Sequence, residues 1–271
     1  MATTATTAAP PAITTAARHR PVAALPAALA AAGILAQVAY PLLDGAPLRA
    51  ATIATVVLLA AAAVTHAAAA WGVRAAASLL AGAAGIGLAA EAVGVATGVP
   101  FGAYDYAGSL GPEVLGVPAL VPLAWTMLAY PCLLLGRRLA GAGRAATALA
   151  GGLALTAWDL FLDPQMVADG HWTWRDPSPA LPGVPGVPLT NYAGWVLVAV
   201  VMVAALDRAL PRARPDQRVP ATVLAWTWAG STLGNLAFFD RPWVAVYGGL
   251  AMGALVVPYL ASFRRASGEP A

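Results

Sequence analysis

Charged side chains are scarce in this chain. Asp, Glu, Lys and Arg together make up 10% of its 271 residues, whereas a soluble domain carries about a quarter. Hydrophobic residues make up 60%, and the mean hydropathy is +0.72. These values exclude an ordinary soluble domain and predict an integral membrane protein.

Lysine is absent, so all 15 basic residues are arginines. Because they lie in short loops between apolar runs, the net charge of +3 does not indicate a nucleic-acid partner. The exclusive use of arginine, together with heavy use of alanine, is typical of a bacterial genome of high GC content. We therefore expect a multi-pass protein of a bacterial cell membrane.

Cysteine and histidine are also rare. The single cysteine, Cys132, lies in an apolar run, which excludes a disulfide framework and a thiolate metal site. His19, His66 and His171 are too few and too scattered for the His clusters of a membrane di-iron enzyme. We expect His66 to be a packing residue and His171 to lie in an interfacial loop. No metal ion is therefore expected.

Two glycine patterns do not indicate a nucleotide cofactor. GAGRAA (141–146) fits a loose dinucleotide fingerprint, but it joins two apolar runs and follows no predicted strand. GAAGIG (82–87) is typical of small residues that allow helices to pack closely. The sequence contains no P-loop and no Ser-His-Asp arrangement, so no cofactor is expected.

Long apolar runs dominate the rest of the chain. A helix of about 20 residues crosses the hydrocarbon core of a bilayer. Windows of that length predict eight spans in an all-α, polytopic helix bundle: 22–43, 50–71, 75–97, 118–136, 144–163, 189–210, 219–239 and 242–263. We expect one transmembrane domain over 21–265, with a disordered Thr/Ala/Pro-rich tail over 1–20 and a short C-terminal tail over 266–271. The first run is too long for the apolar region of a signal peptide, so a retained helix is predicted.

Arginine is distributed unequally between the two sides of the predicted bundle. If both termini are cytoplasmic, only Arg49, Arg175 and Arg241 fall outside. The other twelve then lie inside, as the positive-inside rule requires: Arg18, Arg20, Arg74, Arg137, Arg138, Arg144, Arg208, Arg212, Arg214, Arg218, Arg264 and Arg265. This orientation places the two longest loops, 98–117 and 164–188, on the external side.

Five polar residues interrupt the apolar runs at a similar depth. A helix rises ~1.5 Å per residue, so Asp159 lies about 22 Å from the inner end of its helix. By the same rise, Glu91 lies about 25 Å from the arginine at the inner end of its helix. Asp163 follows Asp159 by four residues and therefore lies on the same helical face. Asn191 begins the sixth span from the outside, and Asn235 ends the seventh. Four helices thus contribute polar groups to one outer layer.

Each of these residues also has a purely structural interpretation. Asp163 precedes a proline, an arrangement common at helix N-termini, and Asn191 could serve only as a helix cap. Glu91 could pair with a loop cation such as Arg175, and Asp159 could have a structural partner. The residues by themselves leave these alternatives open beside a catalytic role.

Two carboxyl groups about 6 Å apart on one helical face cannot both ionise easily in a medium of low dielectric. One of the pair is therefore expected to keep its proton, and a position at a helix C-terminus makes a negative charge on Asp163 less favourable still. A carboxylic acid beside a carboxylate can protonate an electron-rich alkene and then deliver water to the carbocation. Nearby aromatic faces would stabilise that cation. The same groups could instead bind protons for transport.

The segments GVPALVPLAW (116–125) and GVPLTNYAGW (186–195) share a GVP and a Trp at the same offset. A parallel internal duplication of the chain would produce this similarity between the two segments. The frequent use of Pro at the first position of a helix would produce it as well.

The middle third of the chain resembles a known family, the membrane carotenoid hydratases typified by CruF. The resemblance rests on GVPFGAYDY (98–106), LGPEVLGVPALVPLAWTMLAYP (110–131), LTAWDLFLDPQMVADGHWTW (155–174) and GVPLTNYAGW (186–195), and WDLFLDPQM followed by Trp-x-Trp is its most specific part. It implies addition of water, without a cofactor, to the terminal double bond of an acyclic (ψ) carotenoid end group. The product would be a tertiary alcohol.

The resemblance identifies candidate residues, and the chemistry of hydration assigns their roles. Asp159 and Asp163 would form the catalytic acid/base pair, Glu91 would support them, and Asn191 would orient water or a carboxyl group. The residues expected to line the substrate pocket are Tyr104, Tyr106, Trp158, Trp172, Trp174, Trp195 and Asn235. The substrate would be a carotenoid within the bilayer, and other enzymes of carotenoid biosynthesis are candidate partners.

Two other functions would begin with the same residues. A carotenoid or isoprenoid end-group cyclase would protonate the same alkene and finish by ring closure, but the nearby external loops favour access of water. A proton-coupled transporter of lipophilic molecules would spread charged groups along its path. Here the carboxyl groups share one outer layer, and we expect the inner half of the bundle to lack ionisable groups. A purely structural assembly factor is the remaining alternative.

Overall fold

The computed structural model describes residues 24–266. Over this range eight α-helices, one 3-10 turn and six short strands follow in order: α1 (Ala24–Ala39), η1 (Tyr40–Leu42), α2 (Gly45–Trp71), α3 (Val73–Thr97), β1 (Tyr104–Tyr106), β2 (Glu113–Val114), β3 (Val117–Pro118), α4 (Leu120–Ala140), α5 (Arg144–Ala168), β4 (Trp172–Trp174), β5 (Ala180–Leu181), β6 (Val184–Pro188), α6 (Leu189–Ala209), α7 (Arg218–Ala237) and α8 (Pro242–Ala266). The predicted N-terminal tail, with His19, and the predicted C-terminal tail beyond Ala266 lie outside the described residues.

The helices confirm the predicted all-α polytopic bundle. Within the described residues, seven helices are long and apolar enough to cross a membrane, and α7 is the exception. α7 mixes Thr, Ser, Asn and Gly with its apolar residues, but it packs against α1, α4 and α8 as a full member of the bundle. α2 begins at Gly45, earlier than predicted, because a proline in the first turn of a helix is tolerated.

Asp163 does not lie at a helix C-terminus, contrary to the prediction. α5 continues through Pro164 and ends at Ala168. A proline inside a helix removes one backbone hydrogen bond, but membrane helices tolerate it where neighbouring elements pack around the turn. Both Asp163 and Pro164 are buried in this way. The predicted dipole effect and the capping interpretation of Asp163 are therefore wrong.

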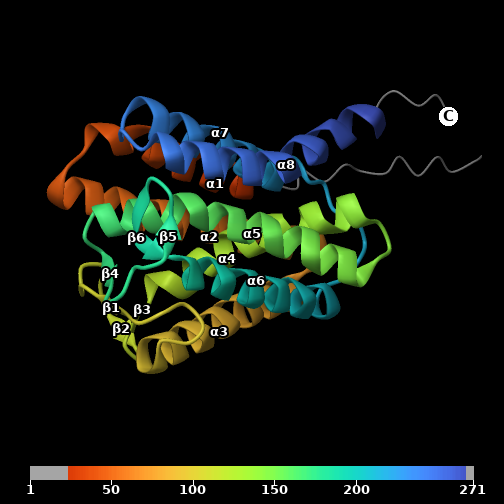
Figure 1. Ribbon diagram of the computed structural model, residues 1–271. Helices are drawn as coiled ribbons and strands as arrows, with labels where there is room; N and C mark the ends of the chain where they lie inside the picture. The colour runs from red at the N-terminus through yellow and green to blue at the C-terminus, as the bar shows by residue number, and fades with distance from the viewer. Residues whose placement is uncertain (1–23, 267–271) are drawn as a thin grey trace, which may run out of the picture.

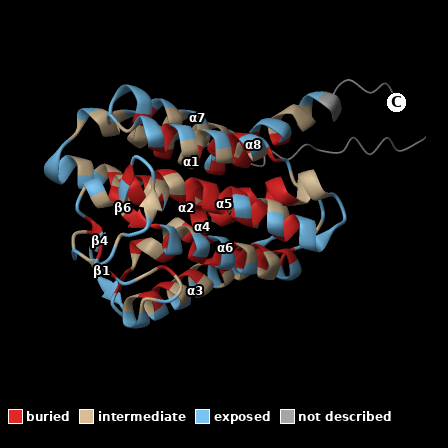
Figure 2. Ribbon diagram, in the orientation of Figure 1, coloured by how far each residue is buried: buried red, intermediate tan, exposed pale blue. Residues whose placement is uncertain are grey.

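The helices form three layers (Figure 1). α1, α7 and α8 make one outer layer, α2, α4 and α5 the middle layer, and α3 and α6 the other outer layer. α4 and α5 are the most buried helices (Figure 2), since 72% and 61% of their apolar windows are covered, compared with 17% for α1. A membrane bundle leaves its outer helices in contact with lipid, so the middle layer positions the buried polar groups.

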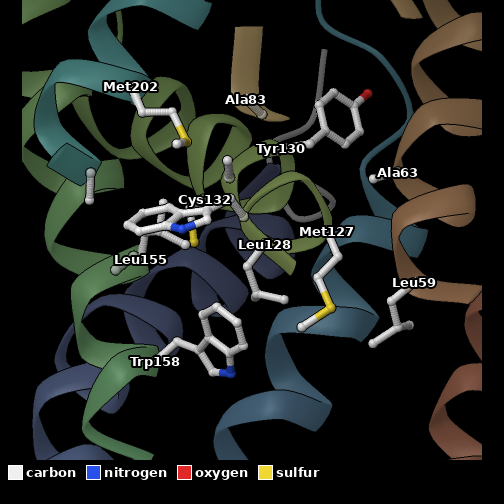
Figure 3. Packing of buried hydrophobic residues seen from close by; sticks show 14 of the residues in the cluster. Leu59, Ala63, Ala83, Met127, Leu128, Tyr130, Cys132, Leu155, Trp158 and Met202 are labelled. Atoms are coloured by element: carbon white, nitrogen blue, oxygen red, sulfur yellow. The ribbon is translucent and has the colours of Figure 1, made fainter. Parts of the chain in front are cut away.

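The centre of the bundle is packed with aliphatic and sulfur-containing side chains (Figure 3). Leu128, Cys132, Leu155 and Met202 are fully buried there. α4 and α5 approach closely because Gly136 has no side chain, and a Cβ at this position would collide with the backbone of α5. This contact fixes α5, which carries both aspartates, against the core.

The two predicted external loops fold into short antiparallel strand pairs at one end of the bundle. β1 pairs with β4 and so joins the two loops, while β2–β3 and β5–β6 are hairpins within each loop. The beginning of α1 and the end of α8 lie at the opposite end (Figure 1). The orientation of the bundle in a membrane remains a prediction.

Asp207 corrects the expectation that the inner half of the bundle lacks ionisable groups. It is 1% exposed near the end of α6, and its carboxylate pairs with Arg137 Nε at 2.8 Å, Arg212 Nη2 at 2.8 Å and Arg144 Nη1 at 3.4 Å. Because its neighbour Arg208 is exposed and a loop follows, the sequence did not reveal this burial. A buried carboxylate so fully paired ties helices together, and it provides no charged path through the bundle.

Candidate active site

A cavity of about 210 Å³ lies beneath the paired strands. Glu91 of α3, Asp163 of α5, Asn191 of α6 and Asn235 of α7 all line it, so the structure brings together the polar groups of four helices. Most of the remaining wall is aromatic or aliphatic. The arrangement is a small set of polar groups facing an apolar space, as in sites for largely apolar ligands.

Asp159 and Asp163 form a hydrogen-bonded pair. The amide nitrogen of Asn191 donates to Asp159 Oδ2 at 2.9 Å and also to Asp163 Oδ2. The indole nitrogen of Trp172 donates to Asp163 Oδ1 at 3.1 Å. One amide thus bridges the two carboxyl groups and holds them close together. Two buried carboxyl groups this close cannot both ionise easily, so we expect one proton to be shared by the pair.

The two aspartates differ in their access to the cavity. Asp163 lines the wall, whereas Asp159 is 0% exposed and lies behind it. Asp159 Oδ1 is buried without a hydrogen-bond partner in the described structure. A buried oxygen without a donor is a poor place for negative charge, so Asp159 is the better holder of the shared proton. A proton on Asp159 reaches the cavity only through Asp163.

Glu91 is surrounded by hydrogen-bond donors. Tyr104 Oη donates to Glu91 Oε2 at 2.5 Å and Tyr106 Oη to the same oxygen at 2.9 Å. The indole nitrogen of Trp125 donates to Oε1 at 3.0 Å. Three donors favour the ionised form of a carboxyl group. Burial opposes ionisation while the donors favour it, and in either state Glu91 is held in a fixed position facing the cavity.

The β1–β4 pair explains how two loops supply these donors. Tyr104 lies opposite Trp174 and Tyr106 opposite Trp172. Side chains alternate along a strand, so these four rings share the buried face, while Asp105 and Thr173 point outward. Two segments far apart in the sequence thus close the outer end of the cavity with one aromatic surface.

The ion pair of Arg175 with Glu91 that we considered is absent. Arg175 pairs instead with Asp105 on the exposed side of the strands, at 2.5 Å. The hydrogen bonds and the charge of Arg175 hold the pKa of Asp105 below its usual value. The strand alternation directs Asp105 toward Arg175 and leaves the tyrosines for Glu91.

The tyrosines of β1 remain donors because of where they lie. Burial, and next the charge of Glu91, raise the pKa of Tyr104 and of Tyr106 far above that of a free tyrosine. Both phenols therefore keep their protons across the physiological range. Their hydrogen bonds to Glu91 do not depend on pH there.

Three tryptophans form the deeper aromatic wall. Trp125 stacks on Trp195 with ring centroids 3.9 Å apart and an interplanar angle of 17°. Trp158 meets Trp195 edge to face at 5.9 Å. Gly87 makes room for this stack, because a Cβ there would lie 2.7 Å from the ring of Trp125. The faces and edges of these rings surround the space next to Asp163 and Glu91.

Trp125 is a site residue that the sequence analysis did not single out. The similarity between segments 116–125 and 186–195 could have indicated it, because Trp125 and Trp195 are the last residues of the two segments. In the structure both GVP segments lie in strands, β3 and β6, that lead into α4 and α6. Trp125 and Trp195, which occupy equivalent positions in the two segments, stack on each other.

Asn191 does not act as a helix cap. Pro188 occupies the N-cap position of α6 and makes no side-chain capping bond, so the amide of Asn191 is free to bind the aspartates. Among the remaining predicted residues, His66 is buried against the hydroxyl of Tyr130 at 2.8 Å. His171 contacts Ser109 Oγ at 2.7 Å in the loops. Neither histidine lines the cavity.

No group of three or more His, Cys, Asp or Glu side chains within residues 24–266 is placed to hold a metal ion. The chemistry available in the cavity is therefore described by its carboxyl, amide, phenol and indole groups. Together they offer two closely spaced carboxyl groups, a third carboxyl group held by three donors, and aromatic faces around an apolar space.

A family model described as carotenoid biosynthesis protein matches residues 52–257. The chain belongs to this family. The matched residues run from α2 into α8 and include Glu91, Asp163, Asn191 and Asn235 of the cavity. The resemblance seen in the sequence is thus confirmed for the family.

A relative of this carotenoid biosynthesis protein is the bisanhydrobacterioruberin hydratase of Haloarcula japonica. The two are 39% identical over 134 residues, which is 48% of this chain and 44% of that protein. The aligned region thus spans less than half the length of the relative. No solved structure matches the chain.

Proposed function

We propose that this carotenoid biosynthesis protein is a hydratase that needs no cofactor. It adds water to the terminal double bond of an acyclic carotenoid end group and produces a tertiary alcohol. The observation that carries the proposal is the pair Asp159–Asp163, which Asn191 bridges and of which Asp163 lines an aromatic cavity. The Haloarcula japonica relative is named as a hydratase, which supports the same class of reaction.

The first step is protonation of the alkene by Asp163, the member of the pair that lines the cavity. Its proton adds to the less substituted carbon, which leaves a tertiary carbocation on the other carbon. This proton is the one that the pair held, so both carboxyl groups are ionised until the third step returns a proton. Asn191 donates to both groups and keeps them aligned during this transfer.

The second step depends on stabilising the cation. Glu91 supplies a negative charge held in place by Tyr104, Tyr106 and Trp125. Preorganised charges of this kind are worth more in a dry site than in water. The ring faces of Trp158 and Trp195 add cation–π attraction.

The third step is attack of water on the cationic carbon. The carbon–oxygen bond forms, and the additional proton on the oxygen passes to Asp163. The carboxyl pair thereby regains the proton that it gave to the alkene, so one molecule of water is consumed and the site is unchanged. The same residue serves as acid and then as base.

The proposal extends to the surroundings of the protein. We place it in a bacterial cell membrane with its substrate dissolved in the bilayer. The acyclic substrate must come from enzymes that lengthen and desaturate isoprenoids, which makes other enzymes of carotenoid biosynthesis its candidate partners. The aromatic, largely apolar wall of the cavity suits such a substrate.

The test is co-expression in a host that accumulates an acyclic carotenoid with ψ ends, followed by mass spectrometry of the pigments. Wild type is expected to yield a product heavier by one water. Asp163→Asn keeps the size of the side chain but cannot donate or accept the proton. It is expected to lower product formation by at least about 100-fold.

The amount of each variant in the membrane fraction is the control for folding. A product of unchanged mass would indicate an isomerase or cyclase in place of a hydratase. Unaltered pigment with several acyclic substrates would reject the proposal. Hydration by Asp163→Asn at the wild-type rate would reject the mechanism.

A further inference from the structure

Asn235 approaches the cavity from the layer opposite to Glu91 and Asn191. It lies near the end of α7, whereas Glu91 belongs to α3 and Asn191 to α6, on the far side of the middle layer (Figure 1). All three line the same cavity. Asn235 therefore faces the acidic side of the site across the space that the substrate would occupy.

The side-chain oxygen of Asn235 is buried and unpaired. The residue is 3% exposed, and Oδ1 has no hydrogen-bond partner in the described structure. Nδ2 donates to the carbonyl oxygen of Ser231 at 2.9 Å. Because that carbonyl can only accept, the amide cannot be turned around, and Oδ1 must be the atom that is left over.

A backbone hydrogen bond also holds in place the end of α7 that carries Asn235. The amide nitrogen of Arg241 donates to the carbonyl of Asn235 at 2.9 Å, which ties the end of α7 to the start of α8. A buried acceptor held in place without a donor implies a donor that is not part of the chain. The cavity that Asn235 lines has room for a water molecule, which can supply such a donor.

We propose that Asn235 Oδ1 binds the water molecule that attacks the carbocation. This inference rests on the hydratase proposed above. Oδ1 accepts one hydrogen of the water, which turns a lone pair of the oxygen away from α7 and toward the cationic carbon. The C–O bond forms from that lone pair, and the extra proton then passes to the Asp163 carboxylate. Asn235 is thus a positioning residue for the nucleophile, and it takes no part in protonation.

This role predicts a change in how the cation is consumed. The cation can be captured by water, or it can lose a proton to Asp163 and return to an alkene. In D₂O the second route leaves deuterium in the recovered substrate. Without a positioned water, the ratio of hydrated product to deuterated substrate falls, while formation of the cation continues.

The experiment compares this ratio in wild type, Asn235→Leu and Asn235→Asp, in membranes supplied with an acyclic carotenoid in D₂O. Leucine has a similar size and no acceptor, and we expect it to lower the ratio about tenfold or more. Aspartate keeps an acceptor oxygen but has no donor for the Ser231 carbonyl, so its ratio is expected to lie between those of wild type and Asn235→Leu. Liquid chromatography with mass spectrometry measures both species in one sample.

Thr227→Val is the matched control. Thr227 is also buried on α7 with an unpaired hydroxyl, but it lies two turns away and does not line the cavity. Its replacement should leave the ratio unchanged. An unchanged ratio in Asn235→Leu, with both species reduced together, would show that Asn235 only packs. If wild type produces neither hydrated nor deuterated carotenoid, the proposed function itself fails, and this inference fails with it.

Discussion

Asp159 and Asp163 differ in what each of them can reach. Asp163 contacts the cavity and accepts a hydrogen bond from Trp172, whereas Asp159 contacts only Asp163 and Asn191 among the polar groups. The i, i+4 spacing brings the two carboxyls together, but only the packing around α5 decides which of them faces the substrate.

This difference predicts a distinct pH dependence for Asp159→Asn. The variant keeps a side chain of the same size but cannot supply a proton to Asp163. Asp163 must then take each proton from water, so the hydration rate is expected to fall about tenfold near neutral pH. The rate should recover as the pH is lowered, because protonated Asp163 becomes more abundant.

Initial rates of hydration across a pH series measure this recovery. Wild type should show a flatter profile over the same range. Equal reductions at every pH would contradict the role of Asp159 as a proton reserve.

Glu91→Gln tests the fixed charge. The substitution preserves the shape of the side chain and an acceptor for the tyrosines, but it removes the negative charge near the cation. We expect a loss of about 100-fold in hydration rate. Tyr106→Phe removes one of three donors and leaves the charge, so its loss should be smaller. A smaller loss for Glu91→Gln than for Tyr106→Phe would contradict the electrostatic role.

At the scale of elements, the pairing of β1 with β4 places four rings over the cavity from two separate loops. Thr173 lies at the centre of β4 and points outward. Thr173→Pro removes a backbone donor and disturbs an extended strand. We expect it to abolish most of the activity although it changes no side chain that contacts the cavity.

Thr173→Val is the matched variant, since valine keeps both the backbone donor and the preference for strands. It should have nearly the wild-type hydration rate. The comparison requires equal amounts of both variants in the membrane. If Thr173→Pro is as active as Thr173→Val, the paired strands do not position the site.

At the scale of the whole molecule, the two ends of the bundle hold different kinds of charge. The end with the cavity holds carboxyl groups paired with neutral donors, and the other end holds Asp207 paired with three arginines. Asp207→Ala leaves the nearly buried Arg137 without its carboxylate. We expect a loss of about 3 kcal/mol in the free energy of unfolding.

Thermal unfolding of the detergent-solubilised protein measures this loss. Asp105→Ala breaks the exposed pair with Arg175 and should change the unfolding temperature little, because exposed ion pairs contribute little to stability. An equal effect of the two substitutions would contradict the assignment of Asp207 as the buried tie between α4 and α6.

Much of the bundle could be predicted because span length and hydropathy are local properties. The predicted spans 75–97 and 189–210 agree closely with α3 and α6. The end of α5 could not be predicted from Pro164, since neighbouring elements decide whether a proline ends a membrane helix. Trp125 and Asp207 were missed for a related reason, because their burial depends on distant segments.

The sequence by itself determined that this is an apolar helical bundle with a few carboxyl groups at one depth. Composition and the rise of a helix are enough for that, because both act along the chain. Only the tertiary structure decided that Glu91 binds tyrosines and a tryptophan, that Asp163 faces the cavity, and that Asp159 lies behind it. These facts depend on which faces of separate helices meet, and local periodicity does not specify that.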